Sequence, residues 1–240
     1  MPIPPETSIG APHSLLANSV SVGSPVIGTA KISTRMNFAV QHLFAAARFS
    51  RSVTAIENAH AGEEIADFWD EILHNSVACV FSCAASLESY ANEMFVDRDV
   101  AFPSYRSELL DKLWETFELK PILEKFEFAL LLREKRKLDR GTRAYESASA
   151  LIELRNALTH FKPEWTDLAT RHRKLSKRLD GKFSPSPFLN DELVFPRRWA
   201  TQGCTKWAVE TVLSFAREFE ALGDMPPKYD NSVWKQKFTA

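Results

Sequence analysis

The feature that most constrains the fold is a long apolar stretch in the first half of the chain, SVACVFSCAASLESYANEMF, at residues 76–95. Apolar or small residues fill most of its positions, and neither proline nor glycine interrupts it. A helix that is apolar on most sides has to be surrounded by other elements, because no broad face of it suits water. The stretch therefore predicts the central helix of a bundle, within a longer helical pattern over about 63–96.

Further periodic segments precede and follow this one. Apolar residues recur at spacings of three and four, and prolines stand where the first turns of helices are expected. Strand-like alternation is scarce. We therefore expect an all-α bundle of about six or seven helices. Besides the central one, helices are expected over about 33–60, 104–117, 121–136, 143–161, 166–179 and 201–222.

The two ends of the chain differ from this bundle. Residues 1–32 are rich in Pro, Ser, Gly and Thr and show no period, so they predict a flexible tail. We expect the helical bundle domain over 33–224 and a second flexible tail over 225–240. The N-terminus lacks the pattern of a signal peptide, and no run of 18 apolar residues occurs. A cytoplasmic protein with no membrane partner is the expectation that follows.

Composition excludes several classes of protein. The 30 basic and 31 acidic side chains give a net charge of −1, which argues against a protein that coats nucleic acid non-specifically. The cysteines, Cys79, Cys83 and Cys204, are too few for a disulfide framework and are expected as small buried hydrophobes. Metal-ligand spacings, phosphate-binding glycine loops and the serine-hydrolase elbow are all missing from the sequence. No metal and no cofactor are therefore expected.

The best candidate for chemistry is the stretch LIELRNALTHFKPEW at 151–165. Its apolar residues step by three and four and predict the buried stripe of the 143–161 helix; they are Leu151, Leu154, Leu158 and Phe161. Pro163 disfavours helical geometry at the residue before it, so His160 is expected in the last helical turn.

The polar residues of this helix point in two directions. At about 100° per residue, Asn156 and His160 lie one turn apart on the outer face, with Glu153 nearby. Arg155 lies about 140° around the helix from His160, on the shoulder of the buried stripe. The two side chains could reach one substrate only if the arginine folded round, the helix end frayed, or a second chain supplied its own pair.

An arginine and a histidine that share a substrate are suited to RNA cleavage. Imidazole can take a proton from a ribose 2′-hydroxyl or give one to a leaving oxygen, and a guanidinium can bind the phosphate and stabilise the charge that develops on it. The spacing alone is uninformative, because Arg35 and His42 fit it as well. What distinguishes the pair at 155 and 160 is the asparagine after the arginine, the core helix and the position at its end.

With these features, LRNALTHF resembles the motif of the HEPN superfamily, all-helical domains marked by an arginine, an adjacent polar residue and a histidine four to six residues on. The matching residues are Arg155, Asn156 and His160. SLESYANEMF is similar to the partner helix often found upstream in such proteins, and the resemblance spans roughly 36–222 in architecture.

The resemblance implies a metal-independent endoribonuclease, often of a toxin or antiviral system, with its site across a homodimer. Arg155 would stabilise the phosphate, His160 would be the acid or base, and Asn156 would orient or bind the RNA. Other members have lost catalysis, so the alternative is a non-catalytic helical module for dimerisation or partner binding. Both the endoribonuclease and the non-catalytic module are compatible with an antitoxin or other partner protein.

Two sets of supporting residues remain open to two interpretations. Glu88 and Asn92, one turn apart on the apolar helix, either face Arg155 and Asn156 near the active face or lock two helices together, with Glu88 as an ion-pair partner of Arg155. The basic tracts REKRKLDR (133–140) and RHRKLSKR (171–178) either guide RNA or are solvated helix ends, and both lack interleaved aromatic residues. Core packing is the expected role of the tryptophans, including Trp114, Trp165 and Trp207.

Overall fold

The computed structural model describes residues 21–22, 32–33, 35–165, 168–190, 192–230 and 238, and the chain divides into two compact units, Met1–Asn37 and Phe38–Ala240. In the first unit, β1 (Ser21–Val22) and β2 (Ile32–Ser33) pair antiparallel, with Ser21 opposite Ser33. The rest of the tail expected over 1–32 lies outside the described residues.

The second unit is helical, which confirms the predicted fold class. Its elements in chain order are α1 (Ala39–Ala59), α2 (Phe68–Val96), α3 (Arg98–Ala101), α4 (Ser107–Phe117), α5 (Ile122–Leu132), α6 (Arg143–Thr159), α7 (Arg171–Leu179), the short π-type turn η1 (Val194–Arg198) and α8 (Gln202–Gly223). Each of the seven longer helices overlaps an expected segment. The four-residue α3 and the turn η1 are too short to leave a periodic pattern in the sequence.

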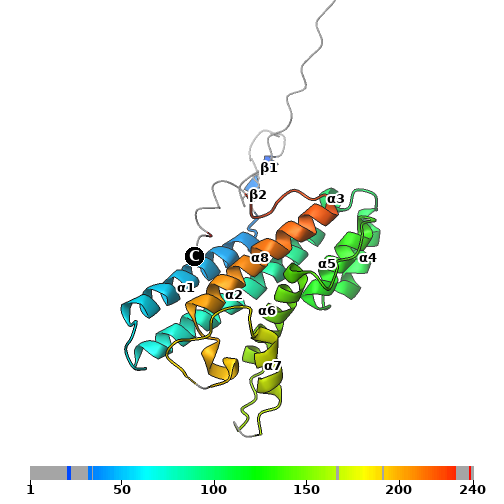
Figure 1. Cartoon of the computed structure of the whole chain (residues 1–240). Coiled ribbons are helices and arrows are strands. Elements are labelled where there is room, and N and C mark those ends of the chain that lie inside the picture. The colour runs from blue at the N-terminus through cyan, green and yellow to red at the C-terminus, as the bar shows by residue number, and fades with distance from the viewer. Residues whose placement is uncertain are drawn as a thin grey trace, which may run out of the picture. The chain divides into compact units, whose positions relative to one another are not determined.

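Helix α2 occupies the centre of the bundle, as its apolar sequence predicts. It packs against α1, α8, α6, α5 and α3, and Figure 1 shows α1, α2 and α8 running alongside one another with α6 beside them. The three cysteines lie fully buried in this core, and burial raises the pKa of the Cys83 and Cys204 thiols. Buried thiols of this kind act as small hydrophobes, as the sequence suggested.

Helix α6 carries the candidate motif and is fixed at its N-terminus by Thr142. The Thr142 hydroxyl accepts a hydrogen bond from the backbone N–H of Tyr145 at 3.2 Å, which is an N-cap. Leu151 and Leu154 are fully buried against the core, as predicted. The prediction that Phe161 belongs to the same stripe is wrong: the helix ends at Thr159, so Phe161 leaves the helical path and is 47% exposed.

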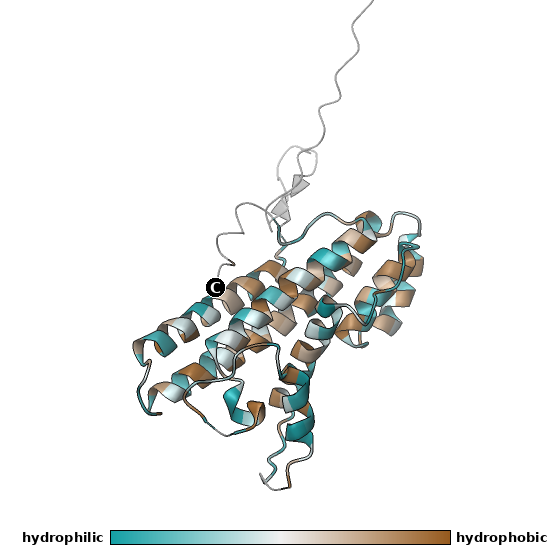
Figure 2. Cartoon of the chain, viewed as in Figure 1, coloured by the Kyte–Doolittle hydropathy of each residue, from teal (hydrophilic) through white to brown (hydrophobic). Residues whose placement is uncertain are grey.

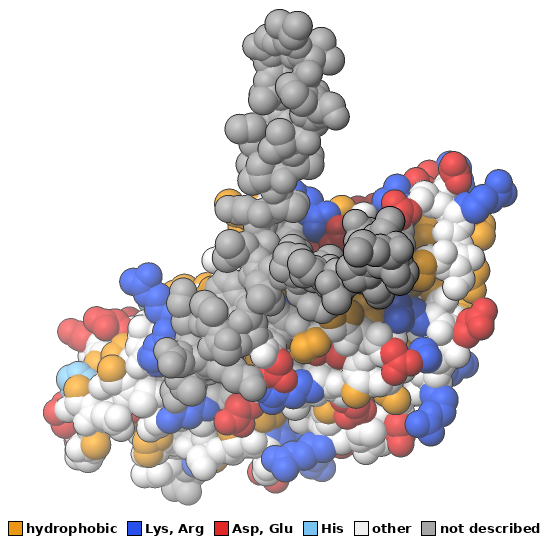
Figure 3. Space-filling model, turned by 90° about the horizontal axis from the view of Figure 1, so that it is seen from above, with side chains coloured by type: hydrophobic (Ala, Val, Ile, Leu, Met, Phe, Trp, Pro, Cys, Tyr) orange, Lys and Arg blue, Asp and Glu red, His pale blue; other side chains and the backbone are white. Residues whose placement is uncertain are grey.

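Helix α7 lies beside the C-terminal half of α6, to which Arg178 connects it (Figure 1). Its buried residues face inward, and most of its ribbon is drawn in the hydrophilic colour in Figure 2. The face of the molecule seen in Figure 3 is different, because acidic and basic side chains are interspersed over its visible atoms.

Part of the segment expected as the second tail, 225–240, packs on the bundle. Tyr229 and Phe238 are both buried, and the Tyr229 hydroxyl lies 2.9 Å from the Ser86 Oγ on α2. The ring of Phe238 stacks on Phe44 of α1. Among the described residues, no helix combines the length and the apolar character that crossing a bilayer requires.

Candidate functional site

The candidate site begins where α6 ends. His160 is the residue after the last helical one, with φ −111° and ψ 40°, and its backbone N–H still donates to the Asn156 carbonyl at 2.9 Å. Pro163 follows shortly afterwards and cannot continue a helix. His160 and Asn156 are both exposed, so the ring and the amide can be reached from solvent.

These two side chains continue a polar stripe that borders α7. Ser149, Glu153, Asn156 and His160 are spaced by four, three and four residues, which places them on one side of a helix. Arg178 of α7 donates to the Ser149 hydroxyl at 3.1 Å and lies 3.5 Å from the Glu153 carboxylate. Because the first two residues of the stripe contact α7, the exposed pair at its end lies on the α7 side of α6.

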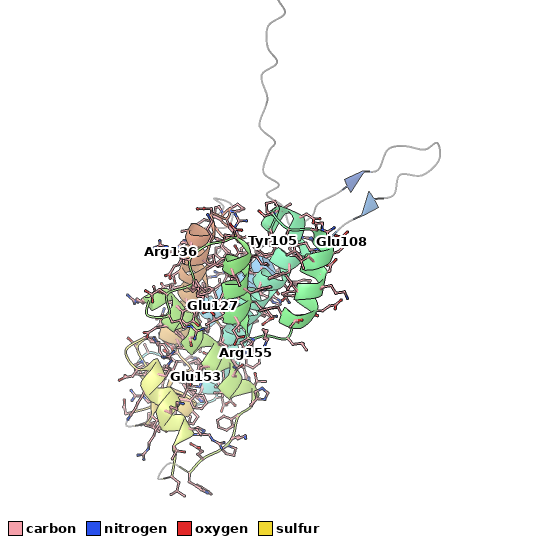
Figure 4. The ribbon with its side chains drawn as sticks, turned by 90° about the vertical axis from the view of Figure 1, so that its right-hand side faces the viewer. Tyr105, Glu108, Glu127, Arg136, Glu153 and Arg155 are labelled. Carbon is pink, nitrogen blue, oxygen red and sulfur yellow. The ribbon has the colours of Figure 1, made fainter. Side chains whose placement is uncertain are left out.

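Arg155 is held on another side of α6. Figure 4 shows Glu153 next to α7 and Arg155 farther from it. The Arg155 side chain is half-buried, and its Nε is buried without a hydrogen-bond partner among the described residues. A donor buried without an acceptor destabilises the folded state, so such groups are uncommon. Within one protomer, therefore, the structure brings Asn156 and His160 together and leaves Arg155 apart from them.

Glu88 and Asn92 have a partner that the sequence analysis did not foresee. Lys125 of α5 donates from Nζ to the Glu88 carboxylate and, at 3.2 Å, to the Asn92 side-chain oxygen. The expected pairing of Glu88 with Arg155 is wrong. The interaction does lock two helices together, but these are α2 and α5.

Lys125 is only 2% exposed, an unusual environment for a lysine. Its ammonium group also lies 5.4 Å from the centre of the Trp114 ring. A signal for this burial exists in the sequence, because Lys125 falls in the stripe of Ile122, Phe126 and Ala129 at helical spacing. A lysine within an apolar stripe predicts a buried cation that needs a carboxylate.

The loop between α6 and α7 is anchored to the start of α7. The Glu164 carboxylate accepts hydrogen bonds from the backbone N–H groups of Arg171 and His172, each at 3.1 Å, and so caps α7. The backbone N–H of His172 is the main reason that the pKa of Glu164 is lowered. The His172 ring lies 3.0 Å from the Lys162 carbonyl and stacks on Phe161.

Trp165 stands out from this anchored loop. Its side chain is 81% exposed, so the expectation that it packs in the core is wrong, whereas Trp207 is buried as expected. The difference arises because Trp165 follows Pro163 and lies beyond the end of the helix that would have carried it inward. Neighbouring Leu168 is also 69% exposed. The loop therefore presents apolar surface beside the motif.

The described part of the chain contains no group of three or more His, Cys, Asp or Glu side chains that could hold a metal ion. No protein-family model matches the sequence, and no curated protein and no solved structure matches the chain. The resemblance to the HEPN superfamily accordingly stands on the motif and on the helical architecture.

Proposed function

We propose that this protein is a HEPN-like, metal-independent endoribonuclease. Arg155 is the observation that carries the proposal. A half-buried guanidinium that forms no hydrogen bond and no ion pair among the described residues is suited to an anion from outside the protein, and two oxygens of a phosphate can be bound together by the planar guanidinium. The accessible imidazole of His160 supplies the acid–base group that such a reaction needs.

In the proposed reaction, His160 removes the proton from a ribose 2′-hydroxyl. The 2′-oxygen then forms a bond to the adjacent phosphorus, the bond from phosphorus to the 5′-oxygen breaks, and the departing oxygen takes up a proton. The products are a 2′,3′-cyclic phosphate and a 5′-hydroxyl end. Arg155 stabilises the charge on the phosphoryl oxygens, and Asn156 binds or orients the strand. The setting implied by the resemblance is a cytoplasmic toxin or antiviral system, with an antitoxin or other partner protein as regulator.

The proposal includes a homodimer, because Arg155 and His160 lie on different sides of α6 within one chain. A two-fold axis near the end of α6 would place Arg155 of one protomer beside His160 of its partner. Two composite sites would then form in each dimer.

The direct test is cleavage of an unstructured RNA by purified protein in the presence of EDTA. We expect His160→Ala to lower the rate roughly 100- to 10,000-fold and Arg155→Ala to lower it roughly 100- to 1,000-fold. His74→Ala is the matched control, since His74 is an exposed histidine on α2, away from the motif. Equal residual rates in the wild-type protein and both motif variants would identify a contaminating nuclease and overturn the proposal.

A mixing experiment tests the shared site. Arg155→Ala and His160→Ala chains, co-expressed so that they pair at random, should recover about one quarter of wild-type activity, because about half of the dimers are mixed and each of these holds one intact site of two. A site built within a single chain would give no recovery. Recovery therefore separates the dimeric arrangement from the monomeric one.

The alternative is a non-catalytic helical module, and the exposed Trp165 and Leu168 favour it, because exposed apolar side chains close together mark interaction surfaces. In that case Arg155 is structural, and Arg155→Ala should lower the unfolding temperature substantially while RNA remains uncut. The nuclease proposal instead predicts that removing the Arg155 guanidinium does not lower the unfolding temperature. The variant that tests this is Arg155→Met, which keeps the aliphatic part of the side chain and removes the unpaired donor. It should leave the unfolding temperature unchanged or raise it.

A further inference from the structure

Helix α7 exposes only cationic side chains. Its buried residues are His172, Leu175, Ser176 and Leu179, and its exposed residues are Arg171, Arg173, Lys174 and Lys177. The helix contains no acidic residue. One turn of helix rises about 5.4 Å, so the exposed charges form a short row of one sign.

Most of these cations are not used by the protein itself. Among the described residues, the side chains of Arg171, Lys174 and Lys177 form no hydrogen bond and no ion pair. Arg178 is engaged, by the Ser149 hydroxyl and by the Glu153 carboxylate. A fold gains nothing from like charges without partners, so the arrangement of Arg171, Lys174 and Lys177 favours an anionic partner.

The row runs beside the polar stripe of α6. Arg178, near the end of α7, contacts Ser149 and Glu153 in the middle of α6, whereas His172, near the start of α7, contacts Lys162 just beyond α6. The two helices are therefore antiparallel, and Lys174 and Lys177 lie between these two contacts. Together with Glu153 and Arg178, they line a hollow of about 480 Å³. The hollow joins the basic row to the side of α6 that carries Asn156 and His160.

The amide groups at the start of α7 are not part of this surface. Glu164 occupies the backbone N–H groups of Arg171 and His172, so an incoming phosphate has to be bound by side chains. The same contact fixes the loop that carries Trp165. An exposed indole on an anchored loop, between a basic helix and the end of α6, offers a flat face on which an unpaired base can stack.

We propose that the exposed face of α7 and the Trp165 ring together bind single-stranded RNA. The row of Arg171, Lys174 and Lys177 binds successive phosphates, and Trp165 stacks on a base close to the phosphate that reaches His160. This inference rests on the proposed function only for the position of the cut, since binding can be measured without cleavage.

The test measures the affinity of full-length His160→Ala protein for a fluorescent 20-nucleotide oligouridine by anisotropy, between about 50 and 200 mM salt. Adding Lys174→Ala and Lys177→Ala should lower the affinity at least about fivefold. It should also reduce the slope of log affinity against log salt by about 1.4, since each single-strand phosphate contact contributes roughly 0.7. The matched control adds Arg136→Ala and Lys137→Ala, which removes the same charge from the other basic tract and should leave affinity and slope unchanged.

Trp165 is tested separately because stacking releases no counterions. Trp165→Ala should lower the affinity roughly 5- to 100-fold without changing the salt slope, and Trp165→Phe should retain most of the affinity. Since the ring is 81% exposed, neither change should alter the unfolding temperature. An unchanged affinity in Trp165→Ala would overturn the stacking role and leave a protein partner as the explanation of this exposed ring.

The outcomes separate this inference from the nuclease proposal. Binding that depends on α7 and Trp165, without cleavage by the wild-type protein, supports the RNA surface and overturns the enzyme. Cleavage that depends on His160, with equal affinity in the α7 double variant and its control, supports the enzyme and overturns the RNA surface.

Discussion

The two basic tracts, residues 133–140 and 171–178, each contain five lysines and arginines but have different surroundings. In the first, Arg133 donates to the carbonyls of Ala101 and Gly223, Lys135 pairs with Asp224, and Arg140 pairs with Glu127 at 3.1 Å. In the second, Arg178 pairs with Glu153, whereas the side chains of Arg171, Lys174 and Lys177 have no partner among the described residues. Figure 4 shows Arg136 well separated from Glu153, so the tracts also occupy different parts of the surface.

The difference shows what decides the role of a basic run. The first tract passes the C-terminal end of α8, where carbonyl groups lack helical partners and attract cations. Arg133, at the end of α5, therefore holds α3, α5 and α8 together. The second tract forms a helix of its own, and Arg171, Lys174 and Lys177 stay available for a partner because they have none among the described residues. Neighbouring acceptors, and not the number of lysines and arginines, distinguish the two.

The largest effect on stability is expected in the first tract. Arg133→Ala should lower the free energy of unfolding by about 2–3 kcal/mol, because carbonyls at the ends of α3 and α8 lose a charged donor. Urea unfolding followed by far-UV circular dichroism measures the change. Arg136→Ala, at an exposed residue of the same tract, should stay within about 0.5 kcal/mol of the wild type. Similar losses in the two variants would remove the distinction between engaged and free cations within this tract.

An intermediate effect is expected at the start of the second tract. The lowered pKa of Glu164, caused mainly by the backbone N–H of His172, means that the folded state favours the carboxylate. Its contribution to stability is present above the unfolded-state pKa of the carboxyl and is lost as the pH falls through the lower folded-state pKa. Glu164→Ala should therefore lower the unfolding temperature at neutral pH, and the gap from the wild type should close in acid. A gap that is constant with pH would show that the cap does not depend on charge.

The smallest effect is expected for an exposed pair of the first tract. Lys135→Ala should leave the urea midpoint unchanged within error, because exposed ion pairs contribute little. The hydrogen bond from Lys135 is the main reason that the pKa of Asp224 is lowered. In the variant, this pKa should rise toward its ordinary range, which an NMR titration of the Asp224 carboxyl measures. A urea midpoint that falls as far as in Arg133→Ala would show that the exposure of a cation does not determine how much it contributes to stability.

The helices were largely predictable, because periodic burial leaves a mark on the sequence. The apolar stretch at 76–95 lies within α2 and identifies it as the central helix. Helix ends were less predictable: periodicity continued to Phe161, whereas α6 stops at Thr159. The exposure of Trp165 could not be read from the sequence either, since burial of an aromatic residue depends on whether the helix reaches it.

The candidate site was predictable only in part. The motif gave Asn156 and His160 at a helix end, and the angular separation of Arg155 from His160 followed from helix geometry alone. The partner of Glu88 depends on how α5 packs on α2, which is a tertiary property: the sequence suggested Arg155 as one possible partner, whereas the structure has Lys125. The distinction between the two basic tracts likewise required knowing which carbonyls and carboxylates lie beside each.

The exposure of Trp165 has a practical consequence. Trp69, Trp199 and Trp207 are buried, so the indole of Trp165 is in water while these rings are shielded. Its fluorescence should emit at longer wavelength and be quenched first by acrylamide. The protein thus contains an intrinsic optical reporter at the end of α6, which can follow the arrival of a ligand there without any attached dye.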